Sequence, residues 1–212
     1  MYDYTQLQEA LIDGDEDLLL EETDELLNQG AGPVELIAEG MMPAMEEVGN
    51  RFSRHEMYVP EVLMCANAMN RAVDRLRPLM EGIAVESRGK VAIGTVKGDL
   101  HDIGKNLVTM FMEVSGFEVL DLGVDVAPDR FIGAVRQEGA QVIAMSALLT
   151  TTVPVMEEMI RVLEAEGLRD QVKVIVGGAP ITQEYADGIG ADGYARDAAG
   201  AVRITSELLS RA

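Results

Sequence analysis

Tryptophan is absent from this sequence of 212 residues, and cysteine occurs once. The single cysteine, Cys65, excludes an internal disulfide framework and any cysteine-rich zinc site. It lies in the apolar helical pattern VLMCANAM, which predicts a buried, inert thiol. Aromatic residues make up only 4% of the chain, so a platform that stacks nucleic-acid bases is not expected.

Basic residues are also scarce. The sequence has 17 Lys and Arg against 37 Asp and Glu, which gives a net charge of −20. Phosphate binding needs clustered Lys and Arg, so this charge argues against a nucleic-acid partner and favours docking to a more basic protein. No apolar run approaches the roughly 20 residues that span a bilayer. The first twenty residues carry acids where a signal peptide has a basic region. We therefore expect a cytoplasmic protein without a membrane partner.

The hydrophobic pattern of residues 1–82 is helical. Apolar residues recur at steps of three or four in four stretches, of which the second ends at Gly30 and the third and fourth begin at Pro33 and Pro60. Four amphipathic helices joined by short loops predict a four-helix bundle. Residues 83–89 have the composition of a linker.

The pattern changes in residues 90–212, where five β-branched runs alternate with five helical stretches. The strand-like runs are 91–96, 117–122, 141–146, 172–177 and 192–195. This alternation predicts an α/β fold, a flavodoxin-like (Rossmann-like) doubly wound parallel sheet. With the strand order 2-1-3-4-5, the first and third strands flank the switch point where such sheets bind ligands. The loops 97–104 and 147–152 are then the loops of interest.

The first of these loops contains most of the stretch GDLHDIGKN (residues 98–106). This stretch resembles a phosphate-binding loop at first sight. That motif places four residues between its first glycine and the Gly-Lys pair, and a Ser or Thr follows the lysine. Here five residues separate Gly98 from Gly104, and Asn106 stands where the hydroxyl belongs. The spacing argues against a P-loop.

Two other interpretations concern the acids and the histidine of this loop. A zinc site built from Asp99, His101 and Asp102 lacks nearby nitrogen ligands, because the other histidine, His55, belongs to the helical part. A surface loop with a helix-capping aspartate and an incidental histidine stays an alternative. The position of the loop at the switch point argues against it.

A third interpretation fits the residue types better. An aspartate two residues before a histidine can accept the ring Nδ1–H, which leaves Nε2 as a basic ligand for a single metal. The other ligands of that metal must then come from a cofactor. Gly104 permits the close approach of a bulky group where the helix begins.

Three motifs at predicted strand ends carry a family resemblance. Asp99-x-His101-x-x-Gly104 matches the DxHxxG motif of cobalamin-binding domains, Ser146-Ala147-Leu148 is similar to their SxL element, and Gly177-Gly178 to their GG pair. In the helical part, FSRHEMYVP (52–60) resembles the cap of methionine synthase. The chain resembles most the free-standing corrinoid proteins of methyltransferase systems.

The resemblance implies that cobalamin binds with its own base displaced and that His101 becomes the lower ligand of cobalt. It implies that Asp99 holds His101, and that Thr152 occupies the position of a serine that bonds this aspartate. Ser146 and Thr150 are expected to bond the displaced nucleotide tail. The full set of cofactor contacts that the resemblance implies is Gly98, Asp99, Leu100, His101, Asp102, Gly104, Ser146, Leu148, Thr150, Gly177, Gly178 and Ala198, with Phe52 and Val59 from the cap.

The function that this resemblance implies is methyl carriage, with cobalt cycling between Cob(I) and methyl-Cob(III). The implied partners are a substrate-specific methyltransferase, a second methyltransferase that passes the methyl group to tetrahydrofolate or a thiol, and a reductive activator of the corrinoid. Two alternatives stay open. One is a cobalamin-dependent regulator or light sensor, and the other is the cobalamin subunit of a radical isomerase.

Overall fold

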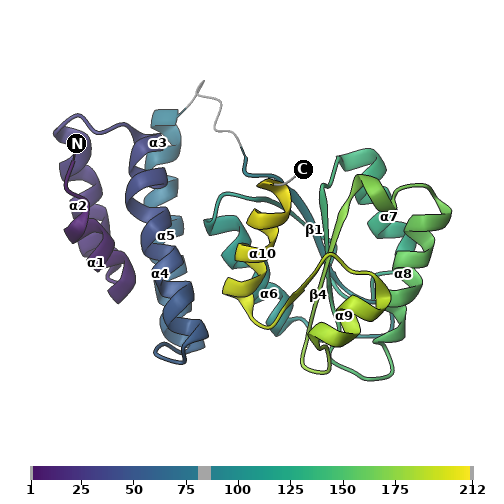
Figure 1. The fold of residues 1–212 in the computed structure, drawn as a ribbon. Coiled ribbons are helices and arrows are strands. Elements are labelled where there is room, and N and C mark those ends of the chain that lie inside the picture. Colours follow the sequence, from purple (N-terminus) through teal and green to yellow (C-terminus); the bar gives the residue numbers. More distant parts are fainter. Residues whose placement is uncertain (1, 81–86, 211–212) are drawn as a thin grey trace. The chain divides into compact units, whose positions relative to one another are not determined.

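The structure is a computed structural model that describes residues 2–80 and 87–210. The chain divides into two compact units, residues 1–86 and 87–212 (Figure 1). Residues 83–86 of the expected linker lie outside the described residues. Residues 87–89 are described with the second unit, where the Arg88 N–H donates to the Gly116 carbonyl at 3.0 Å.

The first unit is helical, as its periodicity predicts. Its elements are α1 (Thr5–Asp13), α2 (Glu16–Asn28), α3 (Pro33–Glu35), the π-helical turn η1 (Leu36–Met41), α4 (Met42–Ser53), α5 (Val59–Leu76) and the 3-10 turn η2 (Arg77–Met80). The predicted bundle of four helices is therefore present as α1, α2, the α3–η1–α4 segment and α5.

The third predicted helix runs on from Pro33, but it is not α-helical throughout. The Met42 N–H donates to the Ile37 carbonyl five residues back, which is a π-helical bond. Pro43 follows, and it has no N–H and crowds the carbonyl four residues before it. A π-helical turn widens the helix at that point and accommodates the proline without ending the helix.

The second unit contains a five-stranded sheet with a helix after each strand. The strands are β1 (Lys90–Thr95), β2 (Glu118–Asp121), β3 (Val142–Ser146), β4 (Lys173–Gly177) and β5 (Gly193–Ala195). The helices are α6 (Ile103–Val114), α7 (Pro128–Glu138), α8 (Pro154–Ala165), α9 (Gln183–Ile189) and α10 (Ala198–Ser210), with a 3-10 turn η3 (Arg169–Gln171) before β4. Every strand pair is parallel, and the order is β2-β1-β3-β4-β5, which confirms the predicted topology.

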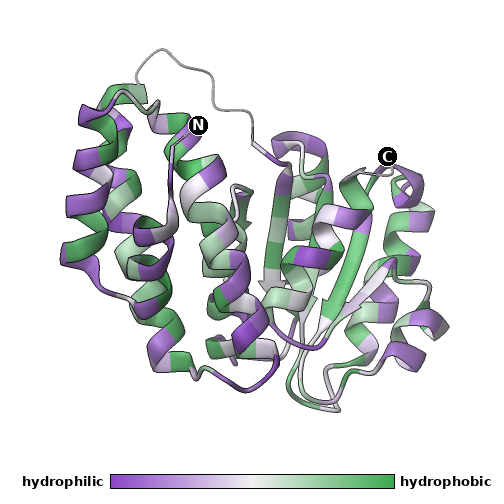
Figure 2. Ribbon diagram, turned by 60° about the vertical axis from the view of Figure 1, so that its left-hand side comes forward, coloured by the Kyte–Doolittle hydropathy of each residue, from purple (hydrophilic) through white to green (hydrophobic). Residues whose placement is uncertain are grey.

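The helices cover both faces of this sheet (Figure 1). Helices α6 and α10 lie together on one face, where Met112 and Ala201 pack on the sheet. Helices α7, α8 and α9 cover the other face, where Phe131, Met156 and Ala186 are buried. Coloured by hydropathy, the central strands are hydrophobic along most of their length, whereas the helices alternate between hydrophobic and hydrophilic residues (Figure 2). The central strands β1, β3 and β4 are thus buried on both faces, as a doubly wound sheet requires.

The register brings the carboxyl ends of the central strands level with one another. Thr95 of β1 pairs with Ser146 of β3, which pairs with Gly177 of β4. The loops that follow β1 and β3 therefore leave the sheet side by side at the switch point. Among the described residues, no helix is both long and apolar enough to cross a membrane.

Candidate functional site

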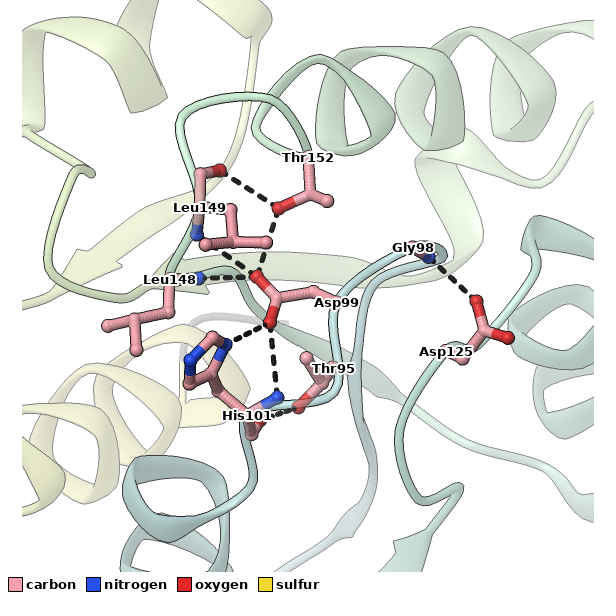
Figure 3. A network of polar contacts seen from close by, with 8 residues as sticks. All are labelled: Thr95, Gly98, Asp99, His101, Asp125, Leu148, Leu149 and Thr152. Atoms are coloured by element: carbon pink, nitrogen blue, oxygen red, sulfur yellow. Dashed lines mark hydrogen bonds and ion pairs between the residues drawn. The ribbon is translucent and has the colours of Figure 1, made fainter.

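Asp99 is the centre of a polar network at this switch point (Figure 3). It lies in the loop after β1 and is fully buried. One carboxylate oxygen, Oδ1, accepts hydrogen bonds from the His101 ring Nδ1 at 2.7 Å and from the His101 backbone N–H at 3.1 Å. The other oxygen, Oδ2, accepts from the backbone N–H groups of Leu148 at 2.7 Å and Leu149 at 3.1 Å and from the Thr152 hydroxyl at 2.9 Å.

These hydrogen bonds decide the charge of the carboxylate. Burial alone raises the pKa of Asp99, but the hydrogen bonds from the Leu148 N–H, the His101 ring and the backbone groups outweigh it and hold the pKa well below its usual range. Asp99 is therefore ionised at neutral pH. Because five donors surround it, the buried charge is compensated without a Lys or Arg partner.

The ionised carboxylate fixes the state of His101. A carboxylate is only an acceptor, so the ring nitrogen that faces it, Nδ1, carries the proton. In the neutral ring, Nε2 is then unprotonated and has a lone pair for a metal. The His101 side chain is about half exposed, at 51%, whereas that of Asp99 is fully enclosed. The loop therefore presents one basic nitrogen at the surface of this unit, supported from beneath by a buried anion.

Further contacts hold the backbone of this loop. The hydroxyl of Thr95, a buried residue at the end of β1, donates to the His101 carbonyl at 2.8 Å. Asp125, in the loop after β2, accepts a hydrogen bond from the Gly98 N–H at 2.7 Å. Sequence reasoning missed both residues, as well as the amide of Leu149, because a hydroxyl or a carboxylate near a strand end gives no distinctive pattern.

Two of the three motifs contain glycines, and the space around these glycines differs. A Cβ at Gly104 meets nothing within 4 Å, although glycine in a helix costs about 1 kcal/mol relative to alanine. A Cβ at Gly178 (φ +126°) would lie 1.9 Å from the Ala147 carbonyl oxygen, and one at Gly177 would lie 2.9 Å from the Ala195 oxygen. Contacts within the protein thus explain Gly177 and Gly178, whereas the space at Gly104 is open to a bulky ligand.

Large apolar side chains are exposed around His101. Leu100 is 71% and Ile103 81% exposed in the β1 loop, and Leu148 and Leu149 are 43% and 41% exposed in the β3 loop. Exposed apolar side chains around one basic nitrogen suit a large ligand with apolar edges. Together with the open space at Gly104, this donor set fits a corrin whose cobalt takes a single protein ligand.

The remaining predicted cofactor contacts are distributed over both units of the chain. Ser146 ends β3 and is half-buried, Thr150 is exposed in the loop that follows, and Ala198 is buried at the start of α10. Phe52 and Val59 belong to the helical unit, where Phe52 is half-buried near the end of α4 and Val59 is 39% exposed at the first position of α5.

Asp102 stands apart from the other two side chains of the zinc interpretation, Asp99 and His101. Asp102 does not join the Asp99 network, and its Oδ2 accepts from the Asn106 side chain at 3.2 Å. Within residues 2–80 and 87–210, no group of three or more His, Cys, Asp or Glu side chains could hold a metal ion. The described residues therefore contain no ligand set that matches the zinc interpretation.

A doubly wound sheet with an Asp-supported histidine at its switch point defines a class of ligand-binding α/β protein, and comparison with known proteins identifies the family. A model described as a B12 binding domain matches residues 89–203, and a second one with the same description matches residues 4–77. The chain therefore belongs to the B12-binding family, whose cofactor is cobalamin.

Individual relatives agree with this assignment. The chain is 45% identical to the trimethylamine corrinoid protein of Methanosarcina barkeri, over 96% of this chain and 94% of that protein. It is 39% identical to a corrinoid protein of Desulfitobacterium hafniense strain Y51, over 97% of both chains.

Solved structures are similar as well. A cobalamin-binding protein from Desulfitobacterium hafniense DCB-2 matches with a TM-score of 0.84 at 33% identity and covers 97% of this chain and 98% of that one. The methanol:cobalamin methyltransferase complex MtaBC from Methanosarcina barkeri matches with a TM-score of 0.83 at 28% identity, over 99% of this chain and 80% of that one.

Proposed function

We propose that the protein is a corrinoid methyl carrier that binds cobalamin with the cofactor's own base displaced and His101 as the lower ligand of cobalt. Cobalamin, when bound, supplies a cobalt centre that accepts a methyl group and gives it up again. The observation that carries the proposal is the Asp99–His101 pair, in which a buried, ionised carboxylate keeps Nδ1 protonated and Nε2 basic.

The residues around this pair have separate tasks. Asp99 makes the imidazole a better ligand, because its negative charge raises the electron density of the ring. Thr152 and the two amides of the β3 loop keep that charge in place. The exposed leucines at 100, 148 and 149 offer apolar contact to a corrin. Gly104 leaves room for it.

The relatives support a methyltransferase as one of the proposed partners. Proteins named trimethylamine and dimethylamine corrinoid proteins are 41–48% identical to this chain, and the MtaBC structure is a methyltransferase complex. We assign to this protein a substrate-specific methyltransferase as donor partner. A second methyltransferase then takes the methyl group to tetrahydrofolate or a thiol, and a reductive activator restores the oxidised cofactor. The chemistry of the methyl donor belongs to the first partner.

The proposal is tested by the His101→Ala variant reconstituted with methylcobalamin. We expect the cofactor to stay bound, its absorption spectrum to shift to that of a form without the imidazole ligand, and methyl transfer to slow. His55→Asn is the matched control. It removes the other histidine of the chain, and asparagine accepts the positive φ of 61° found there. The control is expected to have the wild-type spectrum.

Several results would contradict the proposal. A wild-type spectrum of the methylated His101→Ala protein excludes His101 as the lower ligand. Adenosylcobalamin in the purified protein points to a radical isomerase subunit or a light sensor, and selective retardation of DNA points to a regulator.

A further inference from the structure

Asp125 bonds to Gly98 and Asp99, two residues of the loop that leads to the histidine of the site. It lies in the loop between β2 and α7, 26 residues after Asp99 in the sequence. Its carboxylate Oδ1 accepts the Gly98 N–H at 2.7 Å (Figure 3), and its own N–H donates to the Asp99 carbonyl at 3.0 Å. Asp125 therefore bonds to the backbone on both sides of the Gly98–Asp99 peptide.

The backbone of Asp125 is in an uncommon conformation. Its φ is +54°, in the left-handed region that L-residues with a Cβ rarely adopt. Such conformations persist only where the surroundings determine them, and they concentrate at functional sites. A glycine would meet this backbone requirement without strain, but it would leave the Gly98 N–H without the carboxylate. The side chain is thus the reason for a non-glycine residue here.

The neighbouring backbone brings Asp125 to this place. The Val126 N–H donates to the Thr95 carbonyl at 2.9 Å, and the Thr95 N–H donates to the Gly123 carbonyl at 3.0 Å. The loop after β2 therefore runs along the end of β1 as an added length of parallel pairing, in which Val96 and Val126 form a bridge. Asp125 comes next to Gly98, whose φ of +85° turns the chain towards Asp99.

We propose that Asp125 is a positioning residue for the metal-ligating histidine. By fixing the peptide between Gly98 and Asp99, it aims the Asp99 carboxylate at the His101 Nδ1 and so determines which ring nitrogen is free. The hydrogen bonds of Asp125 to this loop, among the described residues, go to the backbone of Gly98 and Asp99 and not to the imidazole ring. The effect of Asp125 is transmitted through the backbone of Asp99. This inference rests on the proposed role of His101 and extends it to a loop outside the three motifs.

The test compares Asp125→Gly with Asp125→Asn. Glycine keeps the left-handed backbone and removes the acceptor, whereas asparagine tolerates the same backbone and retains an acceptor oxygen. The chain has only two histidines, so 15N NMR of the cofactor-free protein reports the ring of His101 directly, with His55→Asn to assign the signals. Thermal unfolding of each variant measures its fold separately.

In the wild type we expect a single His101 tautomer with a protonated Nδ1. Asp125→Gly should mix this with the Nε2–H tautomer and exchange the Gly98 amide about tenfold faster, the factor for losing about 1.4 kcal/mol of protection. Asp125→Asn should stay close to wild type. When cobalamin is added, Asp125→Gly should show a partial shift towards the His101→Ala spectrum.

Two results overturn the proposal. One is a wild-type His101 tautomer in a folded Asp125→Gly protein. The other is unprotected exchange of the Gly98 amide in the wild type, which needs no variant and so decides the matter even if Asp125→Gly does not fold. Failure of the proposed function looks different. In that case the tautomer responds to Asp125→Gly as expected, but the cobalamin spectrum is the same in wild type, Asp125→Gly and His101→Ala.

Discussion

At the scale of single residues, the site depends on which polar groups are buried. Asp99 and Asp102 are both aspartates of the DxHxxG loop, yet only Asp99 is enclosed and bonded to five donors. Asp102 stays exposed and bonds the amide of Asn106 one turn into α6. Enclosure is what lets one carboxylate control the histidine, because a hydrogen bond is stronger where water does not compete for it.

At Cys65, unlike at Asp99, burial favours the neutral form of the side chain. It is 1% exposed on α5, and its Sγ donates to the Ile12 carbonyl at 3.2 Å, so the predicted burial is confirmed. Burial raises the pKa of the thiol to about 11. Since the thiolate is the nucleophile, the folded protein should react slowly with iodoacetamide at pH 8 and faster as the pH approaches that value.

Mass spectrometry after timed alkylation checks this expectation. The same protein in guanidinium chloride is the control and should be labelled rapidly and completely. Equal rates in the folded and unfolded protein would contradict the assignment of an inert thiol.

At the scale of secondary-structure elements, α6 is attached to β2 through a buried lysine. Lys105 lies in the first turn of α6, and its side chain is only 2% exposed. Its Nζ donates to both carboxylate oxygens of Asp121, at 2.7 and 2.6 Å, and to the Asn106 side chain at 2.6 Å. The Asp121 side chain, at the end of β2, is 41% exposed. The lysine of the Gly-Lys pair that resembles a phosphate loop therefore joins the helix to the strand.

Because Lys105 is buried and Asp121 is partly exposed, replacing one or the other should cost different amounts of unfolding free energy. Asp121→Asn leaves a buried ammonium without its counter-charge, which should cost about 3 kcal/mol of unfolding free energy. Lys105→Met removes the buried charge and leaves Asp121 in contact with water, so its cost should be smaller, about 1–2 kcal/mol. Urea unfolding measures the unfolding free energy of both variants. The variants Asp24→Asn and Arg75→Met, which break an exposed ion pair in the helical unit, are the control. A greater loss in Lys105→Met than in Asp121→Asn would refute this account.

At the scale of the whole molecule, the chain consists of two units with different architectures. Residues 87–212 hold the complete sheet, its covering helices and the Asp99 network, and hydrophobic side chains on both faces of the sheet form their core. A domain with its own core can fold alone. We propose that residues 90–212 are an independent cobalamin-binding domain, that residues 1–82 are a helical cap, and that residues 83–89 link them.

Expression of residues 87–212 tests this division. The fragment should unfold cooperatively by circular dichroism, and with cobalamin it should show the same His101-dependent spectrum as the full chain. The full-length protein is the control, and we expect its cofactor to be better shielded if Phe52 and Val59 contribute to the cap. A fragment without cooperative unfolding would show that the α/β unit depends on the helices.

The two kinds of periodicity in the sequence determined the architecture. Steps of three and four residues mark the helical unit, and short β-branched runs at regular intervals mark the sheet, because side chains repeat differently along helices and strands. The strand order 2-1-3-4-5 and the placement of the β1 and β3 loops at the switch point were predicted and are confirmed. The motifs likewise indicated the family, which the comparisons confirm.

Only the tertiary structure decided what surrounds the histidine. The amides of Leu148 and Leu149 bond Asp99 from about fifty residues away, and Asp125 bonds Gly98 from another loop. Backbone donors have no sequence signature, since every residue except proline has one. The π-helical turn before Pro43 and the tight contact of Gly178 with the Ala147 carbonyl also depend on how segments pack. The sequence thus placed the histidine at the switch point, and the fold enclosed the anion that sets its tautomer.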